Sequence, residues 1–308
     1  MKRLALILIA LGSALILAGA LIPVTASSTS SPSNTKQSLE ITDDLGRTVT
    51  IAETPQRIVS LAPSITEILF ALELGDKVVG VTNRCNYPAE ALDQPKVGDY
   101  FSTSLEAIVA QDPDIVFSDG HDPVGAQLEE LEITMVVLQP QDIGGILGNI
   151  ELVGEISSKE VEAEELVAEM EMRIGAVAAE TAGAERPIVF YVIDATNPAT
   201  PWTVGPGSFI DALINLAGGE NMVKVSKAYY QISLEEVVAS DPDIIIGTTS
   251  HGTAFIPDFA NLSGWKEMGA VKNGEIYLVE DDLVSRPSPR IVEGLEEIAK
   301  IIHPELFP

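Results

Sequence analysis

The sequence predicts an α/β protein of two similar lobes with mostly parallel central sheets, joined by one long α-helix, with a ligand cleft between the lobes. Three observations support this: a duplicated segment, buried strands that follow helices, and a long helical segment between the copies. The segment SLEAIVAQDPDIVF (104–117) returns as SLEEVVASDPDIII (233–246), with nine of fourteen positions identical. At 308 residues and 46% hydrophobic composition, the chain can bury two cores.

Each copy of the repeat predicts a helix followed directly by a strand. Ser104 and Ser233 are predicted N-caps, and Glu236 completes a capping box with Ser233, whereas the first copy has alanine at that position. Asp-Pro-Asp then ends each helix, because proline cannot continue it. The apolar runs that follow are typical of parallel strands buried on both faces.

Similar elements surround both copies of the repeat. RIVSLAPSITEILFALELGDKVVGV (57–81) reads as strand, turn, helix and strand, and RPIVFYVI (186–193) with SFIDALINLAGGENMV (208–223) supplies the same order. We therefore expect an N-terminal lobe at 41–156 and a C-terminal lobe at 184–308.

Between the lobes, a connecting helix is expected at 157–183. Ser157-Ser158-Lys159-Glu160 reads as a capping box that opens it, and Gly183 would end it. One stiff helix would restrict hinge motion more than flexible connections would.

The N-terminus reads as an export signal. The basic Met1-Lys2-Arg3 and the apolar run 4–22 predict that residues 1–26 are a signal peptide or a retained anchor. Residues 27–40 are then expected to be a Ser/Thr-rich linker. No cysteine lies near the end of the run, so lipid attachment is not expected. The folded part is expected outside the cytoplasm, in the periplasm or tethered to the membrane.

Composition argues against several classes of function. The net charge of −28, with 18 lysines and arginines, disfavours nucleic acid or an anionic membrane as partner. The single cysteine, Cys85, permits no internal disulfide, and no structural-zinc spacing is present. GxSxG, HExxH and phosphate-loop motifs are absent, and a metallocluster oxidoreductase would need more cysteines, so we do not expect an enzyme.

The loops after the repeated strands are the first place to look for a ligand site, because parallel sheets bind ligands at the carboxyl ends of their strands. SDGH (118–121) and TTSH (248–251) place His121 and His251 at nearly equivalent positions in the two lobes. These histidines could approach the metal of a bound chelate from both sides. The alternative is that both are ordinary exposed loop histidines.

Aromatic and charged side chains also fall on loops. Rings there suit a bulky apolar ligand, and the alternative is packing onto the core. Scattered charges could supply polar contacts or simply be solvated. These candidates are the aromatic Tyr87, Tyr100, Trp202, Tyr229 and Tyr230, and the charged Arg84, Arg286, Asp281 and Asp282.

Glu106 and Glu235 occupy the second position of each repeated helix. A carboxylate there favours the helix dipole, which is a local reason for its presence. The duplication favours a second interpretation, a matched pair of acidic docking points for a partner that bears arginines.

Several segments resemble a known family, the ABC-transporter substrate-binding proteins of the helical-backbone class, which carry vitamin B12, ferric siderophores or haem. The resemblance covers the chain from about Leu39 to its end. CNYP is similar to the CDYP segment common in cobalamin binders. The segments are 41–91, VGDYFSTSLEAIVAQDPDIVF (97–117), LAGGENMV (216–223), RPSPRI (286–291) and CNYP (85–88).

The resemblance implies two lobes, one bridging helix, a cleft that closes little, and a set of site residues. The pocket would be less aromatic and more charged than in the vitamin B12 binders, since Arg84, Tyr100 and Asp119 replace aromatic residues there. The implied docking glutamates fall on Glu106 and Glu235. The implied pocket residues are Ser64, Arg84, Tyr100, Asp119, Trp202, Tyr229, Asp282 and Arg286.

We therefore expect an extracytoplasmic solute-binding protein that carries a corrinoid, cobalamin or cobinamide, to the permease and ATPase of an ABC importer. The alternative within the class is a ferric siderophore or haem. We expect a monomer without a cofactor of its own. A surface protein that keeps its apolar segment and has no ligand in its cleft is the alternative outside the class.

Overall fold

The structure is a computed structural model that describes residues 38–225, 227–250, 253–254 and 257–307. Residues 37–308 form one compact unit. The predicted signal segment, most of the predicted linker and His251 lie outside the described residues. Among the described residues, no helix is both long and apolar enough to cross a membrane.

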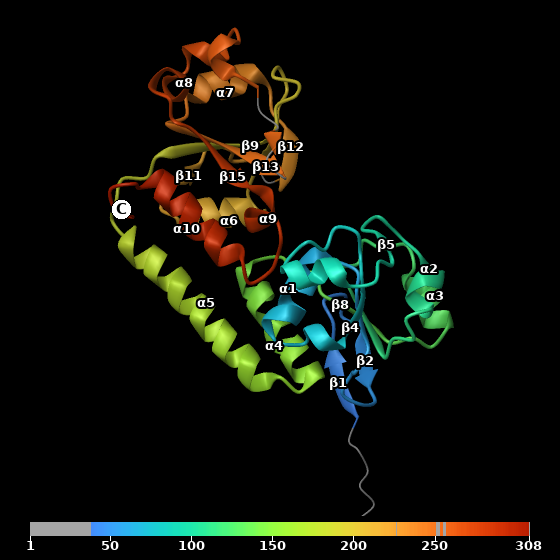
Figure 1. Cartoon of the computed structure of the whole chain (residues 1–308). Helices are drawn as coiled ribbons and strands as arrows, with labels where there is room; N and C mark the ends of the chain where they lie inside the picture. The colour runs from blue at the N-terminus through green and yellow to red at the C-terminus, as the bar shows by residue number, and fades with distance from the viewer. Residues whose placement is uncertain (1–37, 226, 251–252, 255–256, 308) are drawn as a thin grey trace, which may run out of the picture. The chain divides into compact units, whose positions relative to one another are not determined.

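The first sheet follows a small antiparallel hairpin and is parallel throughout. Its strand order is β4-β3-β7-β8 (Figure 1). β7 is the strand of the first repeat copy, and all four of its residues are buried, as predicted. The strands of this half are β1 (Leu39–Thr42), β2 (Thr48–Ile51), β3 (Ile58–Ser60), β4 (Val78–Val81), β5 (Gly98–Asp99), β6 (Ser102–Thr103), β7 (Ile115–Ser118) and β8 (Met135–Val137).

The second sheet contains the same parallel order. β11 pairs with β9, β9 with β13, and β13 with β15, all parallel, and β10, β12 and β14 add antiparallel pairs. The two parallel paths confirm the prediction of two similar α/β lobes. The strands of this half are β9 (Ile188–Asp194), β10 (Trp202–Val204), β11 (Glu220–Asn221), β12 (Tyr229–Gln231), β13 (Ile244–Ser250), β14 (Thr253–Ala254) and β15 (Ile276–Glu280).

The repeated helices are α2 (Leu105–Val109) and α7 (Leu234–Ser240). Ser104 accepts a hydrogen bond from the Ala107 amide, and Ser233 forms the full capping box with Glu236, so both predicted caps are confirmed. The other helices are α1 (Pro63–Ala71), α3 (Gly125–Glu130), α4 (Ile143–Ser157), α5 (Glu160–Glu180), α6 (Phe209–Leu216), α8 (Gly269–Asn273), α9 (Asp281–Val284) and α10 (Ile291–Ile302).

The second aspartate of each Asp-Pro-Asp fixes the sheet beside it. Asp114 Oδ2 accepts from the backbone amides of Gln56, at 2.7 Å, and Arg57, at 2.9 Å, immediately before β3. Asp243 Oδ2 accepts from the amide of Ile188, the first residue of β9, at 2.7 Å. The repeat therefore specifies a helix, a strand and a link to the neighbouring strand.

The long helix α5 is one arm of a helical hairpin. It lies beside α4 and reaches α10 (Figure 1). The predicted capping box at Ser157 is wrong, because Ser157 is the last residue of α4 and Ser158 ends that helix in a left-handed conformation with φ of 56°. Lys159 precedes α5 without a side-chain cap, so the serines form a tight turn between helices.

One buried apolar cluster connects the two sheets. It includes Ile58 and Phe117 of the first sheet, Met170 of α5, Leu295 of α10 and Tyr191 of the second sheet. Arg173 of α5 also makes two 2.9 Å contacts with the Glu296 carboxylate of α10. The bridging helix is therefore part of a continuous core.

Candidate functional site

A cavity of about 320 Å³ lies where loops of both lobes meet. The first lobe contributes residues that follow β3, β4 and β7, and the second contributes the segment that follows β15. The site is thus at carboxyl ends of parallel strands, as expected for this class of sheet. Its lining is Pro63, Ser64, Arg84, Tyr100, Phe101, Asp119, Asp281, Asp282, Ser285, Arg286 and Pro287.

Tyr100 and Asp119 form the polar wall of the first lobe. The Tyr100 hydroxyl donates to Asp119 Oδ2, and burial together with this carboxylate raises the pKa of the phenol. His121 Nδ1 lies 3.4 Å from both the Tyr100 hydroxyl and Asp119 Oδ1. The Phe101 ring packs edge-on against Tyr100, with centroids 4.6 Å apart, and is 69% exposed. The wall therefore presents an apolar ring beside a hydrogen-bonded acid.

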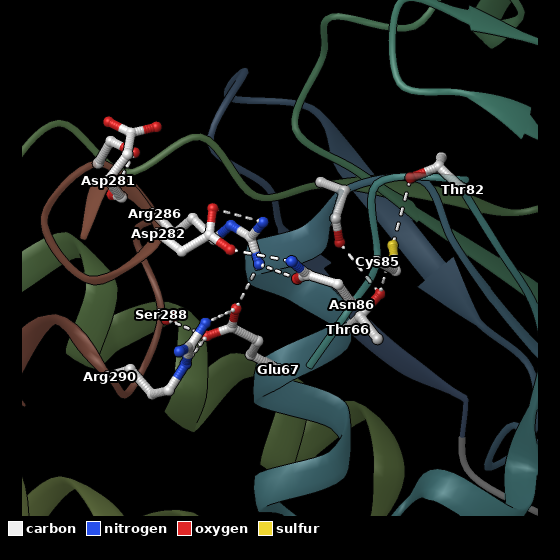
Figure 2. A network of polar contacts seen from close by, with 12 residues as sticks. Thr66, Glu67, Thr82, Cys85, Asn86, Asp281, Asp282, Arg286, Ser288 and Arg290 are labelled. Carbon is white, nitrogen blue, oxygen red and sulfur yellow. Dashed lines mark hydrogen bonds and ion pairs between the residues drawn. The ribbon is translucent and has the colours of Figure 1, made fainter. Parts of the chain in front are cut away.

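Arg286 forms the centre of the opposite wall, but its charge is already paired. Its guanidinium contacts Asp282 at 2.7 Å and Glu67 at 2.9 Å, and Nη1 donates to Asn86 Oδ1 at 2.7 Å. The side chains of Arg286, Glu67 and Asp282 are 13%, 1% and 15% exposed. Figure 2 shows these residues converging from α1, the loop after β4, α9 and the segment after α9.

Glu67 also holds a second arginine. Its carboxylate receives Arg290 at 2.7 and 2.9 Å and the Ser288 hydroxyl at 2.6 Å (Figure 2). The Arg290 guanidinium lies 3.9 Å from the centre of the Tyr87 ring, a cation–π contact. Glu67 of α1 in the first lobe thus binds the RPSPR segment of the second.

The CNYP segment contributes Asn86 to the network of polar contacts around Arg286. Cys85 is buried, and its Sγ lies 3.1 Å from the Thr66 hydroxyl and 3.2 Å from that of Thr82. The Asn86 amide donates to Asp282 at 3.0 Å while its oxygen accepts from Arg286. In this structure the segment supports the junction of the lobes instead of lining the cavity.

Six of the ten predicted ligand residues line the cavity, and His121 lies beside it. Trp202 and Tyr229 do not line it; they lie on β10 and β12 and are 43% and 53% exposed. Burial, followed by the Asp281 carboxylate, raises the pKa of Tyr229. The six are Ser64, Arg84, Tyr100, Asp119, Asp282 and Arg286.

Sequence reasoning missed Glu67, Asn86 and Arg290. The sequence did carry a signal for Glu67, because it is the only charged residue of PSITEILFA; in the structure it is 3% exposed. A carboxylate inside an apolar helix needs a buried partner, and the two arginines of RPSPR offer one. Among the other lining residues, Asp281 was one of the charged loop candidates, whereas Pro63, Phe101, Ser285 and Pro287 were not predicted.

A larger cavity of about 710 Å³ lies between α1, α5 and α10. Side chains of α1 and α5, such as Phe70, Leu166 and Met170, line it together with Tyr87 and Pro88 of the loop after β4 and Pro289 and Arg290 before α10. None of the predicted ligand residues that the structure describes lines it, whereas six of them line the smaller cavity, which is therefore the candidate site. Within the described residues, no group of three or more His, Cys, Asp or Glu side chains is arranged to hold a bare metal ion.

Comparison with known proteins gives a consistent picture. The chain matches the family described as periplasmic binding protein over residues 58–283. It is 32% identical to the uncharacterized ABC transporter substrate-binding lipoprotein YvrC of Bacillus subtilis over 87% of this chain and 86% of that protein. It is 29% identical to the vitamin B12-binding protein of Vibrio parahaemolyticus over 82% of this chain and 91% of that protein.

A solved structure shows the same fold. The ABC-type Fe3+-hydroxamate transport system protein from Saccharomonospora viridis superimposes with a TM-score of 0.69 and 27% identity, over 85% of this chain and 98% of that one. Relatives with different named ligands therefore share the fold of this chain.

Proposed function

Because this chain belongs to the periplasmic binding protein family, whose members are substrate-binding components of transporters, we propose that it binds a corrinoid in the interlobe cavity and delivers it to an ABC importer. The observation that carries this proposal is a cavity lined by strand-end loops of both lobes. The cavity is at the small end for ligand sites, so a corrinoid would extend beyond it. The exposed Phe101 ring at the wall offers an apolar surface for the part that extends.

The ligand argument rests first on similarity to a vitamin B12-binding protein over most of both chains. It rests second on Tyr100. Iron bound by tyrosine needs the phenolate, but here the phenol donates a hydrogen bond to Asp119 and its pKa is raised. A ligand that brings its own metal donors, as a corrin ring does, makes no such demand on the protein. No bond of the ligand is broken in this function, and we propose no enzymatic activity or resident cofactor.

His121 would face the metal side of the chelate. Its imidazole lies beside Asp119 and Tyr100 at the cavity wall and is 53% exposed, so it is accessible to a ligand. Asp119 could accept the proton of one ring nitrogen and leave the other to a metal or to a polar side group. His251 remains a prediction of the sequence.

Delivery would use Glu106 and Glu235. Each is exposed at the second position of its helix, one in α2 and one in α7. Arginines of a permease could pair with both carboxylates, so that recognition tests both lobes together. The permease and its ATPase are the proposed partners, and the protein would act as a monomer outside the cytoplasm, with its N-terminal segment as signal or anchor.

The deciding experiment is calorimetric titration of the purified chain with cyanocobalamin, cobinamide, haem and a ferric trihydroxamate. We expect the two corrinoids to bind at submicromolar concentration. Binding of an iron chelate at that level while both corrinoids fail would contradict the proposal.

The second candidate is a ferric hydroxamate carrier. The similarity to the Fe3+-hydroxamate transport protein favours it, and hydroxamates also enclose their metal without help from the protein. The same titration separates the two candidates directly.

A further inference from the structure

The charged side chains that line the cavity can be compared by sign and by ion-pair partner. Three aspartates and two arginines line it. Arg286 is buried between Glu67 and Asp282, and Glu67 also neutralises Arg290. Two carboxylates and two guanidiniums thus form a cluster with no net charge. The positive charge of Arg286 is balanced within this cluster and is not available to a ligand.

The other arginine is also engaged. Arg84 Nε lies 3.6 Å from Asp99 Oδ2, and both side chains are exposed, at 61% and 39%. This pair is long and solvated, so it is weak. Among the described residues that line the cavity, Arg84 is therefore the one cation that a ligand could recruit.

Two lining carboxylates, Asp119 and Asp281, have no lysine or arginine ion pair in the part of the chain that the structure describes. Burial raises the pKa of Asp281, and the neighbouring Asp282 carboxylate adds to this effect. Each wall of the cavity thus presents a carboxyl group without a lysine or arginine ion-pair partner among the described residues.

We propose that this cleft selects an uncharged or cationic chelate over an anionic one, and that Glu67 and Asp282 set the selection by neutralising Arg286. The inference rests on the proposed function of chelate binding and names the charge class of the ligand. An anion would meet Asp119 and Asp281 with Arg84 alone to balance them, whereas a cation would gain from both acids. Carboxylate or catecholate groups on a chelate are then a disadvantage.

The test compares ligands that differ in charge alone. Cyanocobalamin is neutral overall, and hydrolysis of one peripheral amide gives an anionic monocarboxylate of nearly the same shape. We expect calorimetry to show the monocarboxylate binding at least about tenfold more weakly, a difference of about 1.4 kcal/mol. Equal or tighter binding of the monocarboxylate would overturn the charge proposal while leaving corrinoid binding intact.

If no corrinoid binds, the proposed function fails, but the charge proposal can still be tested. Ferrioxamine B is a cationic iron trihydroxamate, its N-acetyl derivative is neutral and its N-succinyl derivative is anionic. We expect affinity to fall from the cation to the anion by at least about tenfold. A flat or reversed series would overturn the proposal.

Variants connect the selection to the named residues. Asp282→Asn leaves Arg286 with Glu67 as its remaining carboxylate partner, and we expect the ratio of neutral to anionic affinity to fall severalfold. Glu67→Gln should lower the ratio further, with thermal unfolding used to show that it is folded; if it does not fold, Asp282→Asn carries the test. Glu129→Gln removes the same charge from an exposed site on α3 and should leave the ratio unchanged. An unchanged ratio in Asp282→Asn would contradict the proposed role.

Discussion

The two lobes share four parallel strands in the same order, but the segments that follow the last of these strands differ in structure. After β8 the chain is tied down by the β1–β2 turn: the Asp44 amide donates to the Val137 carbonyl at 3.1 Å, and Asp44 Oδ2 accepts from the Gln139 amide at 2.5 Å. After β15 the chain instead forms α9, whose residues Asp281 and Asp282 line the cavity. The shared strands build the framework, and the segments that differ build the site.

A second difference concerns charge at the junction of the lobes. The first lobe supplies a carboxylate, Glu67, and the second supplies two guanidiniums from one segment. Neither side is satisfied alone, because burial of an unpaired charge is costly. The lobes are thus similar in framework but complementary where they meet.

The docking glutamates test whether the likeness of the lobes is itself functional. Replacing both Glu106 and Glu235 with alanine should abolish uptake in cells that depend on the importer, while ligand affinity in calorimetry stays unchanged. The reason is that, in the unmodified protein, each lobe would present one exposed glutamate to the permease, and the variant lacks both. Uptake with Glu129→Ala and Glu185→Ala, two exposed glutamates without assigned partners, is the control. Weakened ligand binding in the Glu106/Glu235 variant would place these residues in the ligand site instead.

Glu67 tests the complementarity of the lobes. Glu67→Ala leaves two largely buried guanidiniums without their shared carboxylate, so we expect a loss of about 3–5 kcal/mol in the free energy of unfolding. Urea denaturation at neutral pH measures it, and Glu129→Ala on exposed α3 should change stability by less than about 0.5 kcal/mol. A loss below about 1 kcal/mol for Glu67→Ala would mean that water replaces Glu67 at little cost.

The framework was predictable because its signals are local. Ser104, Ser233 and the two Asp-Pro-Asp motifs fix caps and helix ends within a few residues, and the internal repeat showed that two lobes share them. The prediction at Ser157 was wrong because it used the same local signals. A sequence that matches a capping box can also end the preceding helix, and here Ser157 ends α4, which packs on α5.

The junction of the lobes was not predictable from local patterns, because its partners are far apart in sequence. Glu67 and Arg286 are separated by 219 positions. Family resemblance placed Arg286 and Asp282 at the cavity, but not the fact that they neutralise each other. Asp282 lies four positions before Arg286, so local spacing could have indicated that pair, whereas the contacts of Arg286 and Arg290 with Glu67 follow from the three-dimensional fold alone.

The paired aspartates Asp114 and Asp243 test how far the repeat works alike in both lobes. Asp114→Ala removes two backbone hydrogen bonds and Asp243→Ala removes one, so we expect losses of about 2 and about 1 kcal/mol. Urea denaturation of both variants gives the comparison, and the Asn variants, which keep an acceptor oxygen, should lose less. Equal losses would show that the second hydrogen bond at Asp114 adds nothing.

The two serine caps give the smallest and sharpest difference between the lobes. Ser104→Ala and Ser233→Ala should each cost about 1 kcal/mol at neutral pH. They should diverge in acid, because Ser233 works with Glu236: hydrogen bonds from the Ser233 hydroxyl and amide lower the pKa of that carboxyl. A lowered pKa means that this contribution is complete above the unfolded value of about 4.5 and is lost as pH falls through the folded value. The cost of Ser233→Ala should therefore shrink below pH 4.5, while that of Ser104→Ala, which caps through a hydroxyl alone, stays constant. Urea denaturation at pH 7 and pH 3.5 measures both, and a parallel pH dependence of the two variants would refute the assignment to Glu236.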